Sequence, residues 1–357
     1  MSGALIFFNG SVYSPADPFA TAALCQQDKI AWVGSDAGAS SLHDSTSHSV
    51  DLQGLLMTPA FVAGGIYINS QSQGESFISQ LKAEGYTAAC LFCPADQASA
   101  LESLFEASGI SPYIYLDASN LPAVLPNCAH GVYLNPVQTE AAQVAEALDR
   151  AVGLGLRVSL YAGSPQALTA SLALAAHYRQ ETDYRQGFRL EAVSYLSDHD
   201  LEQAVSTASL VGFSRAAAGS DTIVRASRAG LAFYLGSDIY SDESAACFGW
   251  KLAQSFVLAA RDEWRVSARS VFNAMTRGVY RALGSQPDYG QLLPGAVADF
   301  SLWQVDQLMV QVPDSRLLAW STDPRARIPL LPALDTENLP SLCGLYRAGS
   351  PINGLDS

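Results

Sequence analysis

Between residues 58 and 284, apolar runs of strand length alternate with amphipathic segments of helical length. Near-continuous apolar runs indicate strands that are buried on both faces, as in parallel sheets covered by helices. Eight such units predict an α/β fold in which the parallel sheet closes into a (β/α)8 barrel, a TIM barrel, over residues 58–286. The runs, in chain order, are AFVAGGIYI, TAACLFCP, SPYIYLDA, HGVYLNP, RVSLYAG, FRLEAVSY, SLVGFSR and LAFYLGSDI.

The two ends of the chain share a different character. Short strand-like runs alternate with turns over residues 1–57 and again over 287–357. The Asn9-Gly10 pair is typical of a hairpin turn, and a second turn is expected near Gln27-Asp28. Two long helices, GWKLAQSFVLAARDEW and SARSVFNAMTRGVYRALG, are expected to follow the eighth strand and close the barrel.

Charge and composition limit the partners of the chain. The formal net charge is −14, so the surface should repel phosphate backbones and anionic lipid, and we expect neither nucleic acid nor a membrane as partner. The first residues lack a basic region, and no stretch approaches the ~20 apolar residues of a membrane span. We therefore expect a cytoplasmic protein with reduced cysteines, in which the Cys90 and Cys93 pair serves packing.

Several segments resemble the amidohydrolase superfamily, and most closely its amidohydrolase 3 type. They are DLQGLLMTPAFVAGGIYI near the start, LGSDIYSD at the eighth strand, and SARSVFNAMTRGVYRALG followed by GQLLPGAVADFSLWQVD near the end. The resemblance covers roughly residues 4–68 and 150–350. It implies a metal-dependent hydrolase in which both chain ends, residues 1–57 and 287–357, form a small composite β-sandwich domain beside a barrel of residues 58–286.

The resemblance also implies metal ligands, and this sequence lacks nearly all of them. The family carries an Asp-x-His-x-His run at the end of strand one, a Lys or Glu around strands three and four, a His on each of strands five and six, and an Asp after strand eight. Of these, Asp238 remains, and Arg189 and Glu191 of strand six also match the family pattern. The other ligand positions carry Ala63, Gly65, Tyr67, Tyr133, Tyr161 and Ala192.

None of the five histidines lies at the end of a predicted barrel strand. A zinc centre needs three or four converging ligands, so we expect neither a metal nor another cofactor at the barrel mouth. Without a metal, Asp238 would have to act alone as the catalytic general base, and an ordinary Asp is a weak base for water. An equal alternative is that Asp238 caps a helix or bonds within its loop.

The remaining polar groups could bind a small molecule. Neutral tyrosines donate hydrogen bonds and offer apolar faces. The alternative, which we favour for the tyrosines, is that they fill the volume left by imidazoles and metal. Arg189 and Glu191 alternate along one strand, so they should share a face and a hydrogen-bond network. The candidate substrate-binding residues are Tyr67, Tyr133, Tyr161, Tyr240 and Arg189.

Our functional hypothesis is a homologue of the amidohydrolases that has lost its metal centre and its hydrolase activity, a pseudoenzyme with a binding or scaffolding role. The alternative is an active hydrolase on non-peptide C–N bonds, with a rebuilt metal site or with metal-free chemistry that uses Asp238 and the tyrosines. Whether the chain is an enzyme stays open at this point. The candidate partners are a small-molecule ligand and a second copy of the chain.

Overall fold

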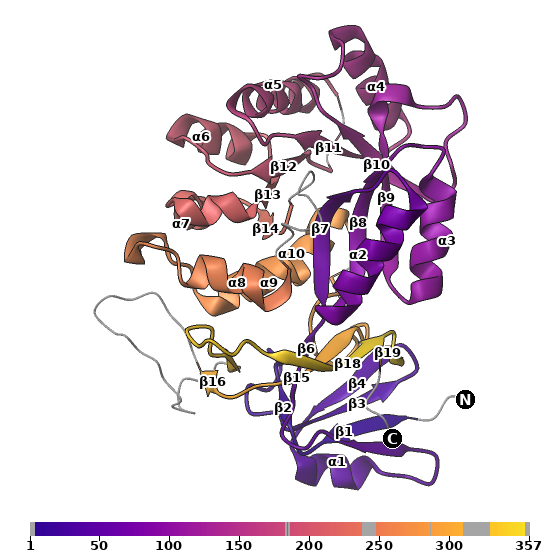
Figure 1. Ribbon diagram of the computed structural model, residues 1–357, viewed down its shortest axis with the longest axis vertical. Coiled ribbons are helices and arrows are strands. Elements are labelled where there is room, and N and C mark those ends of the chain that lie inside the picture. Colours follow the sequence, from indigo (N-terminus) through magenta and orange to yellow (C-terminus); the bar gives the residue numbers. More distant parts are fainter. Residues whose placement is uncertain are drawn as a thin grey trace.

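The computed structural model describes residues 4–182, 184, 186–237, 248–285, 287–309 and 329–353 of the 357-residue chain. A barrel of strands surrounded by helices makes up most of the molecule, and sheets from both chain ends lie below it (Figure 1). Within the described part of the chain, no helix combines the length and the apolar character that crossing a membrane would require.

The eight predicted barrel strands all form, and every neighbouring pair is parallel. A parallel bridge between Gly65 and Ser237 brings the two edges of the sheet together. The predicted α/β barrel is therefore confirmed. Its strands are β7 (Phe61–Tyr67), β8 (Tyr86–Cys93), β9 (Ser111–Asp117), β10 (Ala129–Leu134), β11 (Arg157–Tyr161), β12 (Arg189–Val193), β13 (Leu210–Phe213) and β14 (Phe233–Leu235).

Helices cover the outside of the barrel, and several begin at clear local signals. The side chain of Ser164 accepts a hydrogen bond from the backbone of Ala167, and Pro165 occupies the first helical turn of α5. Ser197 and Asp200 form a reciprocal capping box at the start of α6. The helices are α2 (Gln71–Ala83), α3 (Ala98–Ser108), α4 (Ala141–Gly153), α5 (Pro165–Glu181), α6 (Asp198–Ser206) and α7 (Thr222–Arg228), with 3-10 turns at Ala118–Asn120 and Arg215–Gly219.

The alternation of side chains along each strand separates two apolar layers. Strand β8 shows this clearly, because Cys90 packs with Phe92 and Tyr115 inside the barrel, whereas Cys93 packs in the larger layer between the strands and the helices. Both thiols are buried and free. The CxxC spacing thus places the two cysteines on opposite faces of one strand.

The segment after the barrel strands closes the barrel, but with shorter helices than the sequence predicted. The first predicted helix ends at Val257 and the second breaks at Thr276, whose φ of −121° and ψ of −98° are not helical. After this break, Val279 and Leu283 join the interior cluster and close the amino end of the barrel. These elements are α8 (Gly249–Val257), a 3-10 turn (Asp262–Trp264), α9 (Ala268–Met275) and α10 (Arg277–Leu283).

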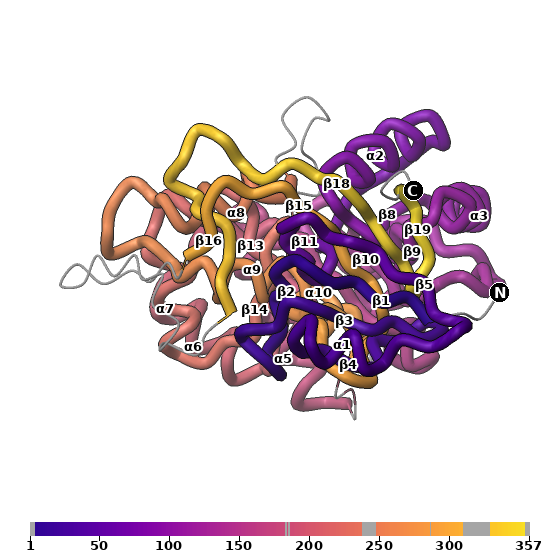
Figure 2. Tube along the Cα trace, turned by 90° about the horizontal axis from the view of Figure 1, so that it is seen from below, coloured from indigo at the N-terminus to yellow at the C-terminus, as the bar shows by residue number. Residues whose placement is uncertain are grey.

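The chain ends form two sheets that face each other across their own core, with Phe7, Met57, Phe300 and Tyr346 between them. Figure 2 shows the indigo N-terminal strands beside the orange and yellow C-terminal strands. One sheet is β4 (Lys29–Gly34), β3 (Ala22–Gln26), β1 (Leu5–Phe8) and β5 (His48–Asp51), covered by α1 (Asp36–Leu42); the other is β19 (Ser350–Asn353), β18 (Ser341–Arg347), β15 (Phe300–Gln304), β6 (Leu56–Pro59) and β2 (Ser11–Val12); β16 (Leu308–Met309) pairs with β17 (Leu331–Pro332).

The predicted domain boundary after residue 57 falls inside β6. This strand pairs with β15 of the end sheet, and the barrel strand β7 begins only two residues after β6 ends. Trp303 of β15 donates a hydrogen bond to Thr58 at 2.9 Å, and its ring packs edge-on against Phe61. One tryptophan therefore contacts both the last residues of the end sheet and the first of the barrel.

The two predicted turns near the N-terminus have different outcomes. The turn at Gln27 is confirmed, because β3 and β4 pair antiparallel across it. The hairpin at Asn9-Gly10 is wrong: β1 pairs with β3 and β5, whereas β2 pairs with β6 in the other sheet. Asn9 does adopt the left-handed conformation, with φ of 59°. A turn does form at Asn9, as predicted, but it connects a strand of one sheet to a strand of the other sheet.

Candidate functional site

The carboxyl ends of the barrel strands bring three of the predicted tyrosines to one region. Tyr67 ends β7, and its hydroxyl donates a hydrogen bond to Asp117 at the end of β9, 2.8 Å away. The rings of Tyr67 and Tyr133 make an edge contact with centroids 6.2 Å apart. Tyr161 ends β11 and packs against the same interior cluster. The structure thus brings Tyr67, Tyr133 and Tyr161 to the carboxyl end of the barrel, in contact with one interior cluster.

These tyrosines differ in how far they reach solvent. Tyr67 and Tyr161 are half-buried, whereas Tyr133 is only 1 % exposed. The ring of Tyr133 lies against Phe92, with centroids 4.5 Å apart. Tyr133 therefore packs below the mouth in this conformation, and only the other two could contact a ligand directly.

Arg189 and Glu191 share the inward face of β12, as their alternation predicted. The Nε of Arg189 lies 3.0 Å from Oε1 of Glu191, and neither side chain has any exposed surface. The guanidinium also donates to the backbone oxygen of Gly64 at 2.6 Å and to the hydroxyl of Tyr234. The guanidinium also donates to the sulfur of Cys90 at 3.1 Å. Arg189 is thus fully engaged with the protein, and its predicted substrate-binding role stays a prediction.

Glu191 accepts hydrogen bonds from three hydroxyl groups. Ser159 of β11 and Tyr234 of β14 each donate to it at 2.5 Å, and Ser237 donates as well. The Ser237 hydroxyl in turn accepts from the backbone nitrogen of Ala192, a residue held at φ of +61°. This carboxylate therefore links strands β11, β12 and β14 across the inside of the barrel, in what we call the Glu191 cluster: Ser159, Arg189, Glu191, Tyr234 and Ser237.

The electrostatics of the Glu191 cluster balance one cation against one anion. Burial raises the pKa of Tyr115 and of the Cys90 thiol to about 12, and burial also holds the pKa of Tyr234 well above its ordinary value, so all three are neutral at pH 7. Burial works against the charged form of Arg189, but the Cys90 sulfur and the Glu191 carboxylate beside it keep its pKa well above the ordinary value. The Arg189 charge also lies over the Tyr115 ring, 4.9 Å from its centroid.

The residues that the structure describes do not fit the metal centre that the resemblance implies. A Cβ at Gly65 would lie only 2.5 Å from Cε2 of Phe92, so any larger side chain there would collide with that ring. A Cβ at Gly64 would lie 2.9 Å from the Tyr234 ring. Across the described residues, no group of three or more His, Cys, Asp or Glu side chains could hold a metal ion. At Gly64 and Gly65, aromatic rings thus occupy the space that a larger side chain would need.

Two predicted site residues lie outside the described part of the chain. Asp238 and Tyr240 belong to residues 238–247 and are not placed. Their predicted roles, catalysis for Asp238 and substrate binding for Tyr240, stay predictions.

Sequence reasoning missed four residues of this region, among them Ser159 of β11, which donates to Glu191. Asp117 follows directly on the apolar run of the third barrel strand, and that polar ending was the available signal. Tyr234 and Ser237 come from the last strand and the residues after it. Nothing in the sequence links them to Glu191, because their contact depends on how the sixth and eighth strands are placed across the inside of the barrel.

Comparisons with known proteins identify the fold. No protein-family model matches the chain, and no curated protein sequence is significantly similar to it. Solved structures do match: an amidohydrolase from an environmental sample of the Sargasso Sea has a TM-score of 0.71 at 15 % identity, covering 98 % of this chain and 93 % of that one. A guanine deaminase from C. acetobutylicum with bound guanine has a TM-score of 0.67 at 14 % identity, covering 98 % and 99 %.

A third match is a mutant atrazine chlorohydrolase from Arthrobacter aurescens, complexed with zinc and atraton. It has a TM-score of 0.69 at 14 % identity, covering 97 % of this chain and 94 % of that one. All three matches span both the barrel and the sheets formed by the chain ends. The chain therefore has the fold of the amidohydrolases, end to end.

Proposed function

We propose that this protein is a member of the amidohydrolase superfamily that does not carry out metal-dependent hydrolysis and that serves as a binding or scaffolding protein in the cytoplasm. The observation that carries the proposal is the state of the barrel interior below the mouth. Phe92 occupies the space in front of Gly65, and the Glu191 carboxylate is saturated by Arg189 and three hydroxyl groups.

The energetics support this proposal. Metal-dependent hydrolysis relies on a cation that lowers the pKa of bound water from 15.7 to about 7. The described strand ends offer tyrosine, alanine and glycine at the matching positions, and His130 lies at the start of β10 rather than at its end. A positioned general base alone contributes about 10²–10⁴-fold, far below what hydrolysis of an unactivated amide requires.

The competing function is hydrolysis of a non-peptide C–N bond. The fold favours it, since a guanine deaminase and an amidohydrolase share the same architecture. The hydrogen-bonded pair of Tyr67 and Asp117 at the mouth would offer a proton donor and a carboxylate to such chemistry. Under this alternative, Asp238 would complete the site.

Metal analysis with an activity screen separates the two functions. We expect protein purified without chelators, and then incubated with zinc, manganese or iron(II), to retain well under one metal per chain after buffer exchange. We also expect no turnover of simple amides, cyclic imides or aminated heterocycles above the rate without protein. One tightly held metal per chain, or turnover that chelator abolishes, would contradict the proposal.

A matched pair of variants tests whether any turnover that is found depends on Asp238. If turnover is found, Asp238→Asn should abolish it under the hydrolase alternative, while Glu106→Gln, a surface change on α3, should leave it intact. Sedimentation velocity tests the remaining part of the proposal, association with a second copy of the chain. A monomer at all concentrations tested would remove that partner.

A further inference from the structure

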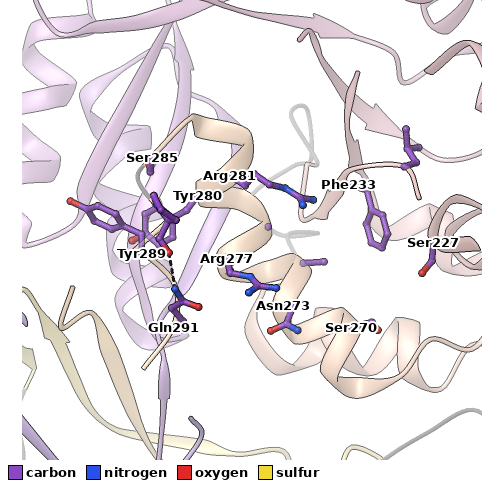
Figure 3. Close-up of a pocket in the computed structure, with 14 residues that line it drawn as sticks. Ser227, Phe233, Ser270, Asn273, Arg277, Tyr280, Arg281, Ser285, Tyr289 and Gln291 are labelled. Carbon is purple, nitrogen blue, oxygen red and sulfur yellow. Dashed lines mark hydrogen bonds between the residues drawn. The ribbon is translucent and has the colours of Figure 1, made fainter. Parts of the chain in front are cut away.

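A cavity of about 550 Å³ lies at the amino end of the barrel, at the opposite end from the mouth. Its walls come from α9 and α10, from the end of α7 and from the start of β14 (Figure 3). This size falls within the range of small-molecule sites. The cavity shares no residue with the Glu191 cluster, so the proposal below does not rest on the function proposed above.

Two arginines of α10 carry charge into this cavity. Arg277 and Arg281 are exposed, and neither guanidinium group makes a hydrogen bond or an ion pair with any described residue. In Figure 3 both guanidinium groups extend from α10 on the side that faces Phe233. They are four residues apart on one helix, a spacing at which like charges repel each other. Their arrangement leaves two adjacent forks of hydrogen-bond donors without a partner.

The walls near the two arginines add neutral polar groups and a ring. The side chain of Asn273 lies beside Arg277 in Figure 3 and makes no hydrogen bond with a described residue. Ser227 and Ser270 contribute hydroxyl groups, and the half-buried ring of Phe233 forms the facing wall. This combination would fit a ligand with an anionic head and an apolar body.

The described lining of the cavity has positive charge and no acidic side chain. The chain carries 34 acidic residues, yet none of the described residues that line the cavity is Asp or Glu. Asp288, which lies between the lining residues Pro287 and Tyr289, pairs with Lys29 at 2.6 Å, and Asp299 accepts from the hydroxyl of the lining residue Tyr280. The cavity is therefore a local cationic site on a strongly acidic protein.

We propose that this cavity binds a small molecule that carries an oxyanion, a phosphate or a carboxylate, with Arg277 and Arg281 as its ligands and Phe233 against its apolar part. The guanidinium fork matches both oxyanions in a bidentate geometry. A bound anion would also offset the repulsion between the two arginines, and this relief favours binding.

Calorimetric titration of the full chain tests the proposal with three probes: phenyl phosphate, benzoate and inorganic phosphate. We expect phenyl phosphate or benzoate to bind, and whichever binds more tightly identifies the head group. Inorganic phosphate should bind more weakly than phenyl phosphate, because it cannot contact Phe233. Arg277→Gln and Arg281→Gln should each weaken binding about tenfold or more, since each removes charge-assisted hydrogen bonds.

Two further variants keep the test falsifiable. Arg179→Gln on α5 makes the same charge change away from the cavity and should leave affinity unchanged. The double change of Arg277 and Arg281 to Lys keeps the charge but loses the fork, and it should bind more weakly than wild type. No detectable binding of any probe at millimolar concentration, or equal weakening by Arg179→Gln and Arg277→Gln, would overturn the proposal.

Discussion

Arg189 and Glu191 lie two residues apart on one barrel strand, and their charges meet at 3.0 Å with both side chains fully buried. Two residues is the repeat of a strand, so both side chains enter the barrel interior. Burying either charge alone would be costly, and the pair becomes tolerable because hydroxyl groups satisfy the remaining carboxylate lone pairs. The barrel interior thus contains an ion pair whose two charges offset each other and whose carboxylate is hydrogen-bonded to hydroxyl groups.

The first prediction concerns the loss of one partner from this pair. Glu191→Gln leaves the Arg189 charge buried without a counter-ion, so the free energy of unfolding should fall by about 3–5 kcal/mol. Urea denaturation followed by circular dichroism measures the change. Glu106→Gln serves as the control, because Glu106 meets Arg347 at the surface and such pairs contribute less than about 1 kcal/mol. Equal losses in the two variants would contradict the prediction.

The second prediction concerns the space in front of Gly65. Gly65→His should lower the free energy of unfolding by about 1–3 kcal/mol or more, because its Cβ would collide with Phe92. Phe92→Ala alone should cost about 3–5 kcal/mol, because it opens a cavity in the barrel. The double variant should lose less than the sum of the two, because the imidazole would enter the space that the ring vacates.

Gly153→His is the matched control for this pair. A Cβ at Gly153 meets no atom within 4 Å, so the same substitution there introduces no collision. Its effect on stability should be additive with that of Phe92→Ala. If Gly65→His is also additive with Phe92→Ala, then Phe92 is not what fills the former ligand position.

Much of this fold follows from the sequence, because its signals are local. The eight apolar runs became the eight barrel strands, since a strand buried on both faces must be apolar along its whole length. The prediction of a hairpin at Asn9-Gly10 was wrong because a turn preference does not determine which strands pair. Strand β2 pairs with β6, which lies more than forty residues later. The break at Thr276 had only a weak signal, because no proline lies near it and Gly278, two residues later, disfavours a helix far less than proline does.

The candidate site was predictable only in part. Alternation along one strand was enough to pair Arg189 with Glu191, because both residues share a face in any strand. The bonds from Tyr234 and Ser237 to Glu191 span more than forty residues and join β12 to β14 and the residues after it, across the intervening β13. Such contacts depend on the register between strands, which a single sequence does not specify. The cavity beside α10 likewise depends on helix packing.

The third prediction concerns pH. Burial raises the pKa of Asp299 above its ordinary value of 3.8, and the hydrogen bonds from Ala348 and Tyr280 only partly offset this. Because the folded-state pKa is the higher one, Asp299 contributes stability that is fully present below about pH 3.8 and is lost as the pH rises through the folded-state value. Asp299→Asn removes this titration.

The stability of Asp299→Asn relative to wild type should therefore increase as the pH rises from about 4 to about 7. Asparagine can still accept from the backbone of Ala348, so the fold should be kept. Denaturant unfolding at four or five pH values gives the difference curve. A flat curve, or one that falls with pH, would show that Asp299 has an ordinary or lowered pKa in the folded protein.

The fourth prediction concerns the two cysteines of the CxxC segment. Cys90 and Cys93 lie on opposite faces of β8, both have no exposed surface, and burial raises the pKa of each to about 12. The thiolate is the reactive form, so neither should react with iodoacetamide in the folded protein at pH 7, and no disulfide should join them under mild oxidation. Among the cysteines that the structure describes, half-buried Cys343 should be alkylated first. Peptide mapping by mass spectrometry assigns each label to its cysteine, and urea should expose Cys90 and Cys93 to the reagent.

Fast alkylation of Cys90 before unfolding, or a disulfide between Cys90 and Cys93, would mean that the interior of the barrel opens far more readily than its packing indicates.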